Sequence, residues 1–327
     1  MSKILITGVA GFIGYHCAKK LLDCGMQIVG IDNLSDYYSI DLKKDRLSGL
    51  LKYEKFQFYK EDIINKDNIF SIFEKFNPNI VIHLAAQAGV RYSIENPNLY
   101  INTNIVGFYN VLDCCIKKNI EHLIFASSSS VYGNICNDCF SENDKADEPV
   151  SVYAATKKAD EVLAYAIAKI YKIKITGLRF FTVYGPFGRP DMAYFSFANA
   201  IKKGKQIKLY NYGEVYRDYT YIDDVIEVIY KILNRKSEYN YDGVDFCIFN
   251  VANGKSYGVN RLIYFLEKYM TRKANICMIE RQLGDVERTK ADTNLLKEKI
   301  GYSACTDLEE GIRKFVKWYN NYYGEEK

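Results

Sequence analysis

The sequence has few of the residues on which metal sites and disulfide frameworks depend. Its three histidines, His16, His83 and His122, lie far apart, and its nine cysteines form no CxxC…CxxC or CxxC…HxxxH set. The lone CxxC of Cys136 and Cys139 is interpreted as a pair of free surface thiols. We therefore expect no metal site, and we expect every cysteine to be a reduced thiol in a cytosolic protein.

Long apolar runs and one-sided charge are also missing. No apolar run approaches the length that spans a bilayer, and the N-terminus enters a strand without a charged-then-apolar leader. The net charge is only +4, with Lys and Arg spread along the chain. Five prolines and no low-complexity stretch argue against long disordered linkers. These absences predict a cytoplasmic protein that binds neither membranes nor nucleic acids.

The first half of the chain alternates apolar runs of strand length with helical segments. Strands are expected at residues 4–7, 27–31, 55–59, 80–83, 122–126 and 174–179. Helical spacing covers residues 12–24, 67–75, 99–117 and 152–171. This alternation predicts an α/β fold with a Rossmann-type doubly wound parallel sheet, helices on both faces and ligands at its carboxyl edge.

Beyond about residue 180 the alternation loosens. Pro186, Pro190 and several glycines break the segment from 185 to 213. We expect a first domain at 1–181, to which 218–252 returns, and a smaller C-terminal substrate-binding domain made of 182–217 and 253–327. The first would bind the nucleotide cofactor, and the second would cap the carboxyl edge of the sheet.

The first expected strand runs directly into a GxxGxxG motif that opens a helix. The motif contains Gly8, Gly11, Phe12, Ile13 and Gly14. The first glycine permits the sharp turn, the second lets the backbone approach a pyrophosphate, and the third allows close helix–strand packing. The helix N-terminus adds amide donors and a positive dipole. Between a strand and a helix, this spacing indicates a dinucleotide site.

An acidic residue ends the second expected strand, about twenty residues further on. There Asp32, followed by Asn33, is placed to bind the ribose hydroxyls of the adenosine. A carboxylate at this position would repel a ribose 2′-phosphate. The predicted cofactor is therefore NAD rather than NADP.

Two more strand ends complete the predicted cofactor site. Asp62 and Ile63 follow the third strand and are candidates for contact with the adenine, although a helix-capping role for Asp62 is an open alternative. Ala85, Ala86 and Gln87 follow the fourth strand, where small residues let the middle of the cofactor lie close.

A YxxxK pair and a serine run supply candidate chemistry. Tyr153 and Lys157 are four residues apart, so they share one face of a helix. A lysine ammonium near a phenol favours the phenolate and lowers its pKa from the usual ~10. The run from Ser127 to Ser130 follows the fifth strand, where hydroxyl groups can bind a substrate.

Taken in this order, the motifs resemble those of the extended short-chain dehydrogenase/reductase family, over essentially the whole chain. Within it, the sequence is most similar to the NAD-dependent UDP-glucuronate 4-epimerases of bacteria. The stretches that carry the resemblance are 32–34, 36–38, 84–93, 180–186, 188–193, 217–224 and 284–286. Phe187 replaces the usual tryptophan and Leu283 a proline, which affects only the expected loop shape.

The resemblance implies roles for the chemical groups. Tyr153 would be the catalytic base, Lys157 its activator and a ligand of the nicotinamide ribose, and Ser128 the partner of the sugar 4-hydroxyl. The helical segments at 99–117 and 152–171 resemble the pair that forms a four-helix bundle between two subunits. A homodimer is therefore expected.

The resemblance also implies a UDP-sugar site. Its residues would be Arg91, Ser127, Ser128, Ser129, Thr182, Arg189, Tyr210, Arg217, Asp285 and Arg288. Among them, Arg217 would pair with the diphosphate, Asp285 would bind the uridine ribose, and Tyr210 would lie near the uracil. Thr182, where UDP-galactose 4-epimerases usually have asparagine, would bind the C5 carboxylate together with the serines. For Arg189, a ligand contact and a surface salt bridge stay open.

The implied reaction is the interconversion of UDP-glucuronate and UDP-galacturonate through a transient 4-keto sugar, for cell-surface polysaccharide. The alternatives are a 4-epimerase of another UDP-hexose, or of an N-acetylhexosamine or its uronate, and a UDP-glucuronate decarboxylase. Decarboxylases and dehydratases usually carry an acid before the Val-Tyr-Gly, where this chain has Ser129 and Ser130. A non-catalytic NAD-binding regulator would tend to lose the YxxxK pair, which is intact here.

Overall fold

The computed structural model describes residues 2–134, 137, 139–235, 243–280 and 287–324. They divide into two compact units, each described by itself. Unit 1 comprises Met1–Ile135, Glu142–Phe180 and Ile229–Asn250, and unit 2 comprises Cys136–Ser141, Phe181–Val228 and Val251–Lys327.

Unit 1 is built on a sheet that holds seven strands of the described chain. Their order across the sheet is β10 (Phe246–Val251), β6 (Lys174–Phe180), β5 (His122–Ser128), β4 (Ile80–His83), β1 (Lys3–Thr7), β2 (Gln27–Asp32) and β3 (Phe56–Lys60). Neighbouring strands from β6 to β3 run parallel. Because the strand order reverses at β1, which lies between β2 and β4, a ligand crevice is expected at the carboxyl ends of these strands.

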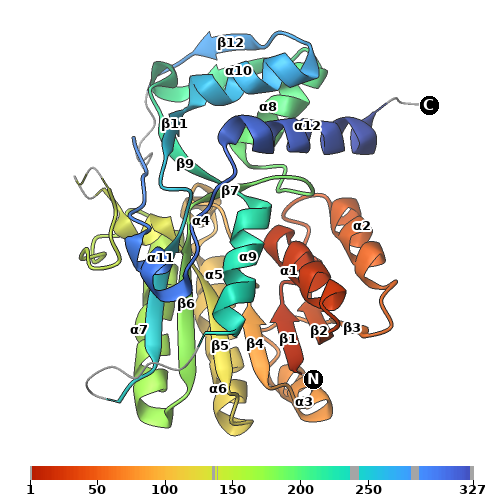
Figure 1. Ribbon diagram of the computed structural model, residues 1–327, viewed down its shortest axis with the longest axis vertical. Coiled ribbons are helices and arrows are strands. Elements are labelled where there is room, and N and C mark those ends of the chain that lie inside the picture. The colour runs from red at the N-terminus through yellow and green to blue at the C-terminus, as the bar shows by residue number, and fades with distance from the viewer. Residues whose placement is uncertain (1, 135–136, 138, 236–242, 281–286, 325–327) are drawn as a thin grey trace. The chain divides into compact units, whose positions relative to one another are not determined.

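Helices cover both faces of this sheet (Figure 1). They are α1 (Phe12–Asp23), α2 (Ile40–Leu50), α3 (Lys66–Phe76), α4 (Tyr92–Glu95), α5 (Pro97–Tyr100), the π-helical η1 (Ile101–Gly107), α6 (Phe108–Lys117), the 3₁₀ turn η2 (Ser129–Tyr132) and α7 (Val152–Tyr171). Alternate strand residues such as Leu5, Val81 and Leu123 meet buried side chains of α3, α6 and α7, including Phe73 and Phe108. This apolar layer fixes the strand ends from which the site residues extend.

Among the described residues, unit 2 contains two smaller sheets, four complete helices and the first part of a fifth, α9 (Ile222–Leu233). The sheets are β11 (Ser256–Gly258), β9 (Tyr216–Tyr221) and β7 (Thr182–Tyr184), and the pair β12 (Asn275–Met278) and β8 (Gln206–Leu209). The helices are α8 (Ala193–Lys202), α10 (Val259–Met270), α11 (Asn294–Ile300) and α12 (Leu308–Tyr323), and η3 (Tyr210–Gly213) is a short turn. Rings of Tyr194, Phe195 and Phe315 pack together between α8 and α12.

The structure confirms the predicted Rossmann-type fold and adds elements that the apolar pattern did not reveal. Helix α2 and strand β10 were not expected, and the single helix expected at 99–117 is instead α5, η1 and α6. At Gly107, where η1 ends, an added Cβ would lie 2.6 Å from Ile63 Cδ1, so the backbone comes close to this side chain.

The segment of 218–252 that was expected to return to the first domain is shorter in the structure. Residues 229–250 belong to unit 1, and the boundary falls within α9 (Ile222–Leu233). The reason is that β9 pairs with β7 and β11 in unit 2. The ligand role of each domain stays a prediction.

Candidate active site

The glycine motif forms a turn that side chains would fill. Gly8 has a φ of +72°, and a Cβ on it would lie 2.7 Å from the backbone nitrogen of Ala85. A Cβ on Gly14 would lie 2.1 Å from the carbonyl oxygen of Gly8. Phe12 and Ile13 occupy the first positions of α1, so the amides of this helix N-terminus lie directly after the turn. The turn therefore offers a bare backbone and N–H donors, as a pyrophosphate requires.

Asp32 lies at the carboxyl end of β2, beside this turn. Its Oδ2 accepts a hydrogen bond from Ala10 N (3.0 Å), and its Oδ1 accepts one from Leu34 N (2.8 Å). Burial raises the pKa of Asp32, and these amides and the charge of Lys43 oppose that rise. The buried Arg46 donates to Ala10 O (2.9 Å), which ties α2 to the glycine turn.

The other predicted adenosine contacts are brought together at the ends of β2 and β3. Asn33 Nδ2 donates to Asp62 Oδ2 (2.8 Å), and Asp62 Oδ1 accepts from Ile64 N (3.0 Å). Ile63 is buried. Asp62 thus braces its own turn, while the N-cap position of α3 is Asn65. Contact with the adenine stays a prediction.

A chain of hydrogen bonds joins the loop after β4 to helix α7. Asn104, in η1, accepts from Gln87 N (2.8 Å) and donates to Gln87 O (3.1 Å) and to Thr156 Oγ1 (2.9 Å). Ala85 N donates to Thr7 Oγ1 at 3.2 Å. These hydrogen bonds fix the loop after β4, which is predicted to bind the cofactor, to α7, which carries Tyr153 and Lys157. Neither Asn104 nor Thr156 belongs to a motif, so nothing local in the sequence identified them.

The predicted chemical groups meet where β5 ends against the first turns of α7. Lys157 Nζ donates to Ala126 O (3.0 Å), two residues before Ser128. Ser128 Oγ accepts from Ser130 N (3.2 Å) at the start of η2. Tyr153 lies one helical turn before Lys157, and its ring packs edge-on against Tyr100 at 6.1 Å. The structure therefore gathers the YxxxK pair and the serine run at one strand end.

Ser127 has a partner that sequence reasoning missed. Its hydroxyl donates to Glu161 Oε1 (2.6 Å), and Glu161 forms a buried two-bond ion pair with Arg179 at 2.8 Å for each bond. The Arg179 guanidinium lies over the Tyr132 ring, 4.7 Å from its centroid. Glu161 is four residues after Lys157, the one sequence signal that could have found it. A direct role for Ser127 at the substrate carboxylate stays a prediction.

These features fit the predicted dinucleotide. The bare glycine turn would take the pyrophosphate, Asp32 the adenosine ribose, and Ala85 and Ala86 the middle of the cofactor. Arg91, exposed at the start of α4, and the half-buried Ser129 lie on the loops that follow β4 and β5. Among the described residues, no group of three or more His, Cys, Asp or Glu side chains is arranged to hold a metal ion.

Unit 2 carries the remaining predicted substrate residues. Thr182 begins β7 and is in register with Tyr219 of β9. Arg189 forms a two-bond ion pair with Asp191, with Nε to Oδ1 at 3.1 Å. Phe187, in the same loop, has a φ of +53° and packs on Trp318 with ring centroids 4.9 Å apart. The salt-bridge alternative for Arg189 is thus present, and its contact with a ligand stays a prediction.

A second group in unit 2 lies around β9. Arg217 NH1 donates to the carbonyl oxygens of Tyr216 (2.9 Å) and Glu287 (3.2 Å). The Arg288 guanidinium lies 4.8 Å from the centroid of the Tyr216 ring. Tyr210 begins the turn η3. Asp285 lies outside the described residues.

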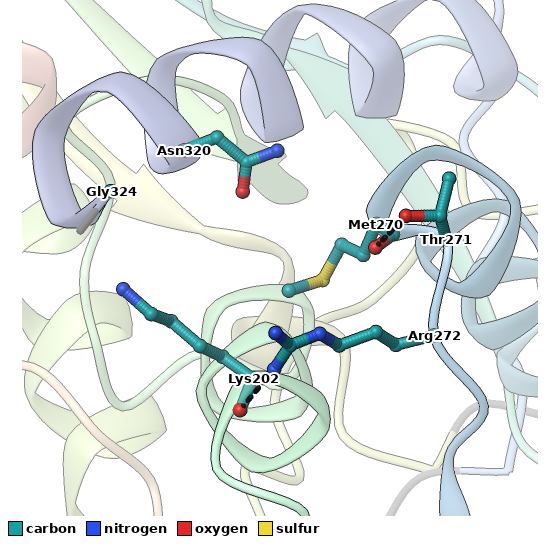
Figure 2. Close-up of a pocket in the computed structure, with 6 residues that line it drawn as sticks. All are labelled: Lys202, Met270, Thr271, Arg272, Asn320 and Gly324. Carbon is teal, nitrogen blue, oxygen red and sulfur yellow. Dashed lines mark hydrogen bonds between the residues drawn. The ribbon is translucent and has the colours of Figure 1, made fainter.

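Unit 2 also has a cavity of about 520 Å³, whose lining includes none of these residues. Figure 2 shows the side chains that line it. Its lining residues are Lys202, Met270, Thr271, Arg272, Asn320 and Gly324. Arg272 donates to Lys202 O (2.8 Å) and Lys202 Nζ to Tyr323 O, so these cations satisfy carbonyl groups at the ends of α8 and α12. We assign these side chains a structural role.

Two features of the whole chain bear on the sequence predictions: its cysteines and the length of its apolar helices. The structure assigns no disulfide to the eight cysteines among the described residues, and Cys136 lies outside that set. Within the described part of the chain, no helix is long and apolar enough to cross a membrane.

Comparison with known proteins gives matches over nearly the full length. The NAD dependent epimerase/dehydratase family matches residues 4–252. Protein CapI of Staphylococcus aureus is 44% identical over 98% of this chain and 99% of its own. A probable UDP-glucuronate 4-epimerase of Rhizobium meliloti is 40% identical over 98% of both chains. The UDP-glucuronic acid 4-epimerase of Bacillus cereus, solved with UDP-glucuronic acid and NAD, is 31% identical, with a TM-score of 0.90 over 98% of this chain and 100% of that one.

Proposed function

Because the chain belongs to the NAD dependent epimerase/dehydratase family, we propose that it is a UDP-glucuronate 4-epimerase that uses NAD. It interconverts UDP-glucuronate and UDP-galacturonate. The observation that carries this proposal is the site at the end of β5, where Lys157 is held at Ala126 O next to the serine run, on the same helix face as Tyr153. Full-length similarity to enzymes with this activity supports it.

The proposed reaction uses the side chains at the end of β5 for proton transfer. Tyr153 takes the proton of the C4 hydroxyl and later returns it, while Ser128 holds that hydroxyl. Lys157 is the proposed activator of Tyr153, because it places a positive charge on the same face of α7. When bound, NAD supplies reversible oxidation at C4, and because it is regenerated in each cycle, none need be added.

The substrate carboxylate explains the expected preference for a uronate. We assign Thr182 to it, with the hydroxyl groups of the serine run. A 4-keto uronate is a β-keto acid, which loses CO2 when its carboxylate bond aligns with the carbonyl π system. Donors that fix the carboxylate out of that alignment keep the reaction an epimerisation. Arg217 and Arg288 supply positive charge for the diphosphate, an anion that Arg binds well.

The setting of the enzyme is part of the proposal. The similarity to Protein CapI supports a role in supplying cell-surface polysaccharide. We place the enzyme in the cytoplasm, where nucleotide sugars are made. We also propose a homodimer, because the helices expected at its interface carry exposed apolar side chains, including Ile101, Val106, Tyr109, Val162 and Ile170.

Product separation tests the proposed substrate. Purified protein without added NAD should convert UDP-glucuronate to UDP-galacturonate, with a kcat/KM for UDP-glucose roughly 100-fold lower. A neutral CH2OH leaves buried donors without their carboxylate partner, and that cost appears in the transition state. Equal or faster turnover of UDP-glucose would contradict the uronate assignment. A UDP-pentose with release of CO2 would instead favour the decarboxylase alternative.

A further inference from the structure

Lys157 has a buried acidic neighbour that the proposed reaction does not use. Its Nζ lies 3.1 Å from Asp160 Oδ2, three residues further along α7. The Lys157 side chain is 2% exposed and that of Asp160 is 1% exposed. Both charges are thus withdrawn from water next to the proposed proton-transfer site.

This pair is poorly explained as a device for stability. Burying two charges costs several kcal/mol per ion, and the attraction offsets that cost only when the remaining polar atoms are also satisfied. Asp160 Oδ1 is buried with no hydrogen-bond partner. A half-satisfied buried carboxylate costs free energy, so its presence calls for another reason.

Two ionisable groups interact with the pair electrostatically: Glu161 on α7 with Asp160, and His83 on β4 with Lys157. The other ionisable groups nearby contact other residues: Arg179 on β6 binds Glu161, Tyr132 on η2 lies under Arg179, and Tyr100 on α5 packs against Tyr153 of α7. Glu161 is already bound to Arg179 and Ser127. Burial, and then the charge of Lys157, lower the pKa of His83 to about 3, so it is neutral. Among the described residues, Asp160 is therefore the carboxylate left to balance Lys157.

The geometry also limits where the ammonium group can point. A lysine ammonium has three N–H donors on a flexible four-carbon stem. Ala126 O accepts one donor at 3.0 Å and Asp160 Oδ2 a second at 3.1 Å. One donor remains, and the stem is held between β5 and α7.

We propose that Asp160 is a positioning residue of this enzyme, which acts as the counter-ion of the Lys157 ammonium and holds it at the end of β5 with one donor free. The proposal rests on the proposed function, from which the roles of Lys157 and Tyr153 come. Without the carboxylate, the ammonium would lose its buried counter-ion and one of its two fixed acceptors, so it would swing more freely. Asp160 thus acts on the reaction only through Lys157.

If Asp160 positions Lys157, the rate of the reaction should depend on the protonation of Asp160 as well as on the proton transfer by Tyr153. Burial raises the pKa of Asp160 to about 7, an effect that the charge of Lys157 opposes and that of Glu161 reinforces. Above this pH Asp160 is ionised and Lys157 has its counter-ion. As the pH falls through about 7, Asp160 takes up a proton and that support is lost. The kcat of the unmodified enzyme should therefore fall over this range.

Asp160→Asn tests the proposal, because it keeps the shape and one acceptor but removes the charge. We expect kcat above pH 7 to fall about 10- to 100-fold, with KM for UDP-glucuronate changed less than about threefold. The fall of kcat near pH 7 should disappear from the pH profile. Bound NAD(H), released by heat and assayed, should be lost more readily, since the free donor of Lys157 is a proposed ribose ligand.

Asp245→Asn is the matched control. It breaks another buried ion pair of unit 1, in which Asp245 Oδ1 lies 2.9 Å from Arg235 NH2, with side chains 1% and 3% exposed. This variant should lose stability yet keep kcat, its pH profile and its bound NAD(H). If both variants behaved alike, Asp160 would have only a structural role.

The outcomes separate this proposal from the proposed function. Unmodified protein that turns over no UDP sugar would overturn both. Active protein together with an Asp160→Asn variant of unchanged kcat and pH profile would overturn this proposal alone. If the variant does not fold, the unmodified enzyme still decides, since a kcat that stays level well below pH 7 would exclude a titrating Asp160.

Discussion

At the scale of single residues, some side chains of the proposed active site are held in place by hydrogen bonds. Lys157 is tied to Ala126 O, and Ser127 is tied to Glu161. Tyr153 differs, because it is only half-buried, near the N-terminus of α7. A half-exposed phenol next to tied neighbours is suited to exchange a proton with a bound sugar.

Tyr153→Phe should abolish most turnover while leaving binding of UDP-glucuronate within about twofold. The change removes one oxygen and keeps the ring that packs against Tyr100, and loss of a general acid–base group typically costs about 10²–10⁴-fold. Turnover by product separation and affinity by calorimetry give the two values. Tyr165→Phe, on the same helix, is the control and should be active. Near-normal turnover of Tyr153→Phe would remove Tyr153 from the mechanism.

At the scale of elements, α7 carries both proposed catalytic residues and exposed apolar side chains. One side of it packs on β5 and β6 through small residues such as Ala164 and Ala168 and carries Lys157 and Glu161. Val162, Tyr165 and Ile170 of the same helix remain exposed in the single chain. A surface helix normally has a polar outer side, so exposed apolar side chains on α7 are the feature on which the proposed dimer rests.

Val162→Glu should convert the proposed dimer to a monomer. Val162 is 59% exposed on α7, and a carboxylate there would be buried without a partner in a helix-to-helix interface. Light scattering at micromolar concentration measures the mass. Leu51→Glu, at a side chain 57% exposed after α2, should leave the dimer intact. Unmodified protein that is already monomeric would count against the dimer.

At the scale of the whole molecule, buried ionisable groups make stability depend on pH. Burial lowers the pKa of His122 well below its usual range, and Thr176 Oγ1 lies 2.9 Å from its Nε2. Burial raises the pKa of Asp218 to about 6, although three backbone amides bind its carboxylate. The buried histidine favours the folded state less as the pH falls, whereas Asp218 contributes stability that is lost as the pH rises through about 6.

His122→Gln should flatten the loss of stability on acidification. In the unmodified protein His122 is neutral when folded but takes up a proton below about pH 6.5 when unfolded, so it lowers the free energy of unfolding by up to about 1.4 kcal/mol per pH unit. The variant lacks this contribution. Urea unfolding at a series of pH values measures the difference in slope. Identical slopes would mean that His122 is charged in the folded protein.

The sequence by itself determined the fold and the identity of the cofactor. Apolar runs with strand and helix periods, and glycines at a strand–helix junction, are local signals, because each reports the burial or backbone freedom of its own segment. The same holds for Asp32 at the end of β2 and for the spacing of Tyr153 and Lys157 on one helix face. These features needed no knowledge of distant contacts.

Only the tertiary structure decided which side chains form hydrogen bonds and ion pairs with one another. Asn104 binds Gln87 and Thr156, which are 17 and 52 positions away in the sequence. Glu161 of α7 binds Ser127 of β5 and Arg179 of β6. Asp160 could be read from the sequence as one more exposed helical acid, yet packing of α7 on β5 buries it against Lys157. The periodicity of the sequence predicts that a residue faces inward. Which residue it contacts there depends on how the other helices and strands pack, and that information is not local.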